Sequence, residues 1–135
     1  MARRSDQRRD AVFALYQSDV TDRPLDGVLP PGAAAFTRAL AHATEDYAGE
    51  LDGVIERHAR GWTVDRIAPL EHAILRVALL EMLHPDAVPA DVPIPPEGAI
   101  DEAVELAKTY ASAQAPGFVN GILAAALRED RDPVA

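Results

Sequence analysis

The chain has 135 residues, about the length of one domain, and 48% of them are hydrophobic, which is too many for a disordered protein. It contains no cysteine, which excludes disulfide bonds and cysteine–zinc sites, and no uncharged apolar run long enough to span a membrane. The charged N-terminus is not followed by an apolar stretch, so no signal peptide is expected and a cytoplasmic location fits best. The net charge of −9 argues against a general nucleic-acid binder.

The first predicted helix begins at Ser5, a plausible N-cap, and ends near Ser18. Residues 1–9 carry a net charge of +3, whereas the rest of the chain carries −12. Cations oppose the dipole at this end of a helix, so the arginines there are unfavourable for the helix itself. Arginine matches phosphate oxygens and stacks on unpaired bases, so the charge favours RNA or another polyanion, with a solvated tail as the alternative.

The middle of the chain is predicted to be helical on both sides of a short break. After a link rich in proline and glycine, one long helix is expected over Ala33–Ala59, and a single helical turn over 64–67. The next helix, Pro69–His84, is apolar almost all the way round, which is typical of the centre of a bundle. Five prolines then make the loop over residues 85–96 stiff and extended.

Two more helices are predicted, Pro96–Tyr110 with Tyr110 facing inward, and Pro116–Arg128. The pair Asn120-Gly121 falls within the second of them and is interpreted as a close-packing site rather than a hairpin turn. No segment alternates in the manner of a strand, so the predicted fold class is all-α. Residues 1–130 are expected to form a single helical domain, followed by a frayed tail at 131–135.

Residues that could support catalysis or bind a metal are sparse. No two of the four histidines have the i, i+3 or i, i+4 spacing of metal ligands on a helix. No serine lies in a nucleophile-elbow sequence, and no glycine-rich loop is of a phosphate-binding type. We therefore expect no enzyme activity, no metal site and no cofactor, and interpret the acidic residues of the 33–59 helix as a solvated face.

Four blocks of sequence occur in order along the chain: Ala11–Tyr16 (AVFALY), Leu70–Glu81 (LEHAILRVALLE), Ala99–Lys108 (AIDEAVELAK) and Phe118–Leu123 (FVNGIL). Together they resemble the NusB family of bacterial transcription antitermination factors, over about Arg3 to Leu127. The resemblance implies an all-helical fold of about seven helices in two packed three-helix subdomains. It also implies binding to the boxA element of ribosomal RNA leader transcripts, as a heterodimer with NusE, a small-subunit ribosomal protein. That complex would join NusA, NusG and RNA polymerase to suppress premature termination.

The resemblance implies roles for individual residues. The N-terminal basic cluster would contact RNA, and its members are Arg3, Arg4, Arg8 and Arg9. Tyr16 and Glu71 would contact NusE, whereas the residues alone favour structural roles for both, as a core aromatic and as an acid near a helix N-terminus.

The segment Ala113–Gly117 departs from relatives, which often carry basic or polar residues there. Tyr110 and Gln114 are the further RNA candidates in this region, as a stacking and a polar contact. With few phosphate contacts on an acidic chain, RNA binding by this protein alone is expected to be weak and salt-sensitive. A basic partner would supply the missing positive surface.

Two other functions stay open. One is an interaction scaffold whose RNA surface is lost or is masked by self-association, and whether the protein is a monomer or a homodimer is undecided. The other is a NusB-like accessory domain of the kind that precedes RNA cytosine methyltransferases, which would require a methyltransferase domain after Ala135.

Overall fold

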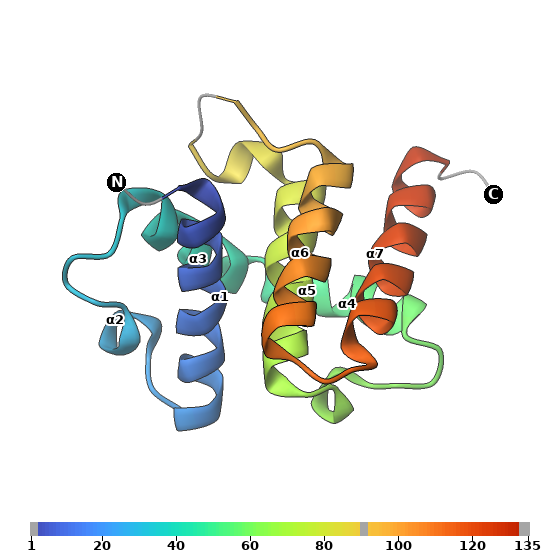
Figure 1. The fold of residues 1–135 in the computed structure, drawn as a ribbon, viewed down its shortest axis with the longest axis horizontal. Coiled ribbons are helices and arrows are strands. Elements are labelled where there is room, and N and C mark those ends of the chain that lie inside the picture. Colours follow the sequence, from blue (N-terminus) through green and yellow to red (C-terminus); the bar gives the residue numbers. More distant parts are fainter. Residues whose placement is uncertain (1–2, 90–91, 133–135) are drawn as a thin grey trace.

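The computed structural model describes residues 3–89 and 92–132, which form seven α-helices and two short 3-10 helices with no strand among them (Figure 1). This confirms the all-α prediction. Within those ranges, no helix is both long enough and apolar enough to cross a membrane. The elements are α1 Arg4–Thr21, α2 Leu25–Val28, α3 Ala35–Asp46, α4 Ala48–His58, η1 Val64–Arg66, α5 Pro69–Leu83, η2 Pro85–Ala87, α6 Pro96–Tyr110 and α7 Ala115–Arg131.

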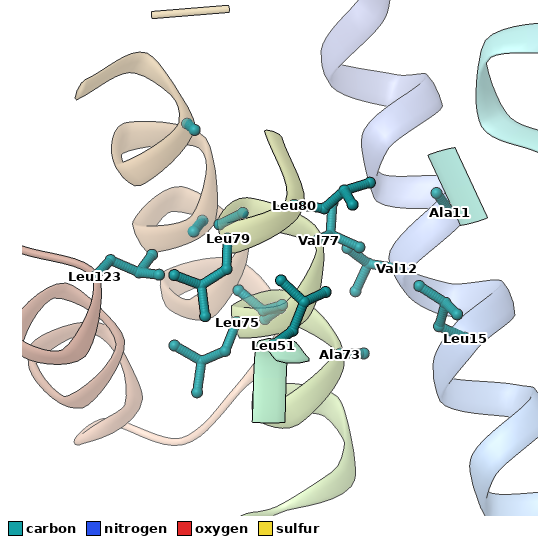
Figure 2. Packing of buried hydrophobic residues seen from close by; sticks show 14 of the residues in the cluster. Ala11, Val12, Leu15, Leu51, Ala73, Leu75, Val77, Leu79, Leu80 and Leu123 are labelled. Atoms are coloured by element: carbon teal, nitrogen blue, oxygen red, sulfur yellow. The ribbon is translucent and has the colours of Figure 1, made fainter. Parts of the chain in front are cut away.

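Helix α5 is the central helix, as its nearly continuous apolar surface predicts. It packs against α1 and α3 on one side and against α4, α6 and α7 on the other. Figure 2 shows Leu80 and Val77 of α5 directed toward Val12 of α1, whereas Leu79 lies on the side of Leu123 of α7. Because α5 packs against both of these groups of helices, the buried apolar side chains form a single continuous core.

The long helix predicted over Ala33–Ala59 is two helices, α3 and α4, so this prediction is wrong. The backbone leaves the helical conformation at Tyr47, which has φ −97° and ψ 9°. Helix α3 packs on α1, whereas α4 packs on α5 and α7, so the chain must change direction between them. The Tyr47 ring stacks on His84 with the centroids 4.1 Å apart, and this tertiary contact lies at the turn.

The ends of the first and last helices also differ from the predictions. The N-cap of α1 is Arg3, and the hydroxyl of Ser5 instead donates a hydrogen bond to Glu102 of α6 at 2.6 Å. Helix α7 continues to Arg131, beyond the predicted end at Arg128, and the Arg131 guanidinium donates to Glu97 at 2.6 Å. Residues 133–135 of the expected tail lie outside the described residues.

An ion-pair cluster centred on Asp52 joins α4 to α5. Arg76 donates to the two Asp52 oxygens at 2.8 and 2.5 Å, and Nε2 of His72 lies 2.6 Å from Oδ1. Burial of the carboxyl acts to raise the pKa of Asp52, but the hydrogen bonds from Arg76 and His72 outweigh it and lower the pKa from 3.8 to about 2.

This shift predicts a pH-dependent contribution to stability. Since the folded pKa of Asp52 lies below the unfolded value, the stabilisation is fully present above about pH 4 and is lost as the pH falls toward 2; it amounts to roughly 2 kcal/mol. Urea unfolding of the wild type and of Asp52→Asn across this range should therefore show a difference in the free energy of unfolding that shrinks as acid is added. A difference that does not depend on pH would contradict this account.

Candidate nucleic-acid interface

Arg3 and Arg4, at the start of α1, are both exposed to solvent. The guanidinium carbon of Arg4 lies 4.1 Å from the centroid of the buried Phe36 ring of α3, and Nη1 donates a hydrogen bond to Gln7 at 2.8 Å. A guanidinium held over an aromatic ring keeps N–H groups free for phosphate oxygens. Arg4 is thus oriented by the protein and still accessible.

Arg8 differs from its neighbours because it is buried, with 8% of its surface exposed. Its Nε lies 2.8 and 3.0 Å from the two oxygens of Glu81 on α5, and its Nη1 lies 3.7 Å from Glu102 on α6. The side chain therefore ties α1 to the two helices beside it. Its predicted RNA contact stays a prediction, and its guanidinium is less available to phosphate than that of Arg4.

Arg9 and Tyr110 are brought together, although they are far apart in the sequence. Tyr110, at the end of α6, packs edge-on against Phe13 of α1 with the ring centroids 5.0 Å apart, and it is 45% exposed, so the prediction that it faces inward is wrong. A hydrogen bond to Asp10 raises the pKa of Arg9, despite the opposing effect of burial, and Tyr110 is close enough to contribute. We use the name α1 face for Arg4, Arg9, Phe13 and Tyr110: Arg4 packs against Phe36 of α3, whereas Arg9, Phe13 and Tyr110 lie where α1 passes the end of α6. This face combines cations with an aromatic ring, the combination that binds single-stranded nucleic acid.

Gln114 and Glu71, predicted to contact different partners, line the same cleft. This cleft of about 320 Å³ lies between the starts of α5 and α7, and its other walls include Trp62, Arg66 and Phe118. Burial raises the pKa of Glu71. We call it the Glu71 cleft. Tyr16 lies elsewhere, half buried on α1 against the core.

A second cleft, of about 500 Å³, adjoins the first, and no pattern in the sequence predicts it. It lies between the end of α4 and α7, and its lining includes Arg57, Arg60, Trp62, Phe118, Gly121 and Arg128. We call it the Trp62 cleft; Trp62 and Phe118 belong to both clefts. Arg57 and Arg60 come from the end of α4 and the loop after it, whereas Arg128 comes from α7, so only the fold brings the three together.

The surroundings of Gly121 contradict the interpretation of Asn120-Gly121 as a close-packing site. Gly121 lies within α7, as expected, but it is exposed, and a Cβ atom built on it would meet no atom within 4 Å. The Asn120-Gly121 pair is therefore not a close-packing site. Its glycine instead forms part of the open wall of the Trp62 cleft.

Comparison with known sequences gives matches over nearly the whole chain. The NusB family profile matches residues 5–128. A transcription antitermination protein NusB from Halalkalibacterium halodurans is 40% identical over 122 residues, which cover 86% of this chain and 87% of that protein. Another from Rubrobacter xylanophilus is 40% identical over 134 residues, covering 91% of this chain and 88% of that protein.

Comparison with solved structures gives the same fold. T. maritima NusB superimposes with a TM-score of 0.81 at 28% identity, covering 95% of this chain and 92% of that one. A chain in the crystal structure of antitermination factors NusB and NusE in complex with dsRNA superimposes with a TM-score of 0.77 at 24% identity, covering 93% of this chain and 96% of that one. At that identity the second likeness concerns the fold alone.

Proposed function

This chain belongs to the NusB family, and from that premise we propose that it is a non-catalytic, RNA-binding transcription antitermination factor. The observation that carries the proposal is the family match over residues 5–128, with relatives named transcription antitermination proteins. The α1 face supports it, because it carries the exposed Arg4 and the partly exposed Arg9, the latter beside the exposed Tyr110, on a chain with a net charge of −9.

The RNA in this proposal is the boxA element of ribosomal RNA leader transcripts. Arg4 and Arg9 bind phosphates, Tyr110 stacks on a base, and Arg3 adds positive charge at the end of the face. Arg8 contributes indirectly, because its ion pair with Glu81 holds α1 against α5. In this proposal an acidic protein binds RNA through a local basic region on α1, with Tyr110 of α6 beside Arg9.

The protein partner in this proposal is NusE, and the wider assembly contains NusA, NusG and RNA polymerase, in the cytoplasm. A basic ribosomal protein complements the acidic body of this chain and would supply further phosphate contacts. Tyr16 and Glu71 are the candidate contacts, because both are partly exposed on helices. Glu71 is already partly desolvated, since burial raises its pKa. Self-association through the α1 face would compete with RNA.

The test is boxA RNA binding by Arg4→Gln/Arg9→Gln, measured with and without NusE at two salt concentrations. Loss of two phosphate contacts should weaken binding about tenfold and reduce the slope of log affinity against log salt by about 1.4. The matched control is Arg23→Gln/Arg131→Gln, which removes two exposed arginines outside the α1 face, one after the end of α1 and one at the end of α7, and should bind like the wild type. Equal affinity of the two double variants would contradict the assignment of the RNA site.

A further inference from the structure

The Trp62 cleft holds two arginines without partners. Among the described residues, neither Arg60 nor Arg128 makes a side-chain hydrogen bond or an ion pair. The third arginine, Arg57, is held by Glu129 at 2.5 and 3.3 Å, and the same carboxylate lies 3.4 Å from Nε2 of His58 without hydrogen-bond geometry. Glu129 therefore offsets one guanidinium, and two remain uncompensated on an otherwise acidic protein.

Trp62 adds an aromatic surface to these cations. It is the only tryptophan in the chain and is 48% exposed, although a large apolar ring is normally buried. The guanidinium carbon of Arg66 lies 5.4 Å from its ring centroid, and the cleft beside it measures about 500 Å³. A half-exposed indole next to unpaired guanidinium groups suits a nucleotide, which has a base to stack and a phosphate to pair.

The wall formed by α7 is open because two glycines lie one turn apart on it. A Cβ atom at Gly117 or Gly121 would meet nothing within 4 Å, so the packing of the protein itself does not require either glycine. Side chains at these positions would instead narrow the Trp62 cleft.

The Trp62 cleft also adjoins the cleft lined by Gln114, a residue that is predicted to contact RNA. Gln114 lines the Glu71 cleft, and that cleft shares Trp62 and Phe118 with the Trp62 cleft. An RNA strand that runs past Tyr110, at the end of α6, and Gln114, at the turn into α7, can therefore continue through the Glu71 cleft to Arg60 and Arg128.

We propose that the Trp62 cleft is a second binding site for single-stranded RNA and takes nucleotides that flank the segment held on the α1 face. Trp62 stacks on a base, and Arg60 and Arg128 bind the adjacent phosphates. An acidic peptide would pair with the two arginines, but its carboxylates do not stack on the exposed indole, whereas an RNA base does, so RNA fits more of the site. The inference rests on the proposed RNA-binding function and extends it.

The test compares two single-stranded RNAs, one of about 10 nucleotides containing boxA and one of about 25 nucleotides that extends it on both sides. The variant is Arg60→Gly/Arg128→Gln. Arg60 has φ 45°, which glycine adopts readily, and glutamine is well tolerated in a helix, so the fold should be preserved. We expect about tenfold weaker binding of the long RNA and unchanged binding of the short one.

Trp62 supplies a direct readout of the cleft. Since it is the only tryptophan, stacking of a base on it should quench the intrinsic fluorescence of the wild type when the long RNA binds. Quenching should be reduced in Arg60→Gly/Arg128→Gln and retained in the charge-matched control Arg23→Gln/Arg131→Gln.

The outcomes separate this inference from the function on which it rests. If Arg4→Gln/Arg9→Gln weakens both RNAs while Arg60→Gly/Arg128→Gln weakens neither, the cleft assignment is overturned and the α1 face stands. If neither RNA binds the wild type, with or without NusE, both proposals fail. If the cleft variant weakens NusE binding but not RNA binding, the cleft is a protein-binding surface and the inference is wrong.

Discussion

Replacing Glu81 by glutamine is expected to lower the free energy of unfolding by about 3 kcal/mol, because it leaves the Arg8 charge buried without its main partner. The side chains of Arg8 and Glu81 are only 10% and 9% exposed, so water cannot replace the lost carboxylate. Glu102 is too far away, at 3.7 Å from Nη1, to make a comparable hydrogen bond. Urea unfolding of Glu81→Gln against the wild type measures the loss.

A second variant shows whether the loss comes from the unpaired charge. In Arg8→Met/Glu81→Leu both charges are removed and the volume is roughly kept, so most of the stability should return. Glu45→Gln, at an exposed carboxylate on α3, is the control and should change the free energy of unfolding by less than about 0.5 kcal/mol. A loss below about 1 kcal/mol for Glu81→Gln would mean that Arg8 does not depend on this pair and is free to reach phosphate.

The Arg8 pair shows what the sequence can predict about the interface. Arg4 and Arg8 are one turn apart and carry the same charge, so the sequence assigns them the same role. The structure separates them, because Glu81 lies far along the chain and only the packing of α5 on α1 brings it to Arg8. A basic cluster can thus be recognised from charge, but not which of its members are accessible.

The fold was predictable where local pattern and tertiary packing agree. The apolar surface of Pro69–His84 has one possible location, the centre of the bundle, and α5 lies there. The turn at Tyr47 was not predictable, because the helical pattern continues through it and a contact with His84 on another element marks the break. The Trp62 cleft was missed for the same reason, since Arg60 and Arg128 meet only in the folded chain.

Substitutions in α5 test whether the helices on its two sides unfold as one unit. Leu79→Ala and Leu80→Ala are each expected to lower the free energy of unfolding by about 3 kcal/mol, since both side chains are fully buried and a cavity would remain. The two leucines are neighbours in the sequence but point to opposite groups, Leu80 toward α1 and Leu79 toward α7 (Figure 2). Unfolding is followed by Trp62 fluorescence, which reports on the loop between α4 and α5, and by circular dichroism, which reports on all helices.

If residues 1–130 form a single domain, both variants shift one transition, and the two probes coincide in each. The expectation follows from the core, because α5 contributes to both groups and cannot unfold from one of them without exposing the apolar side chains of the other. Separate subdomains would behave differently: Leu80→Ala would then shift the circular dichroism at low urea while the Trp62 signal stayed at the wild-type midpoint. Val20→Ala, at an exposed position of α1, should leave both probes unchanged. A shared central helix would also couple the α1 face to the Trp62 cleft, since an RNA bound at both would stabilise the whole core rather than one half of it.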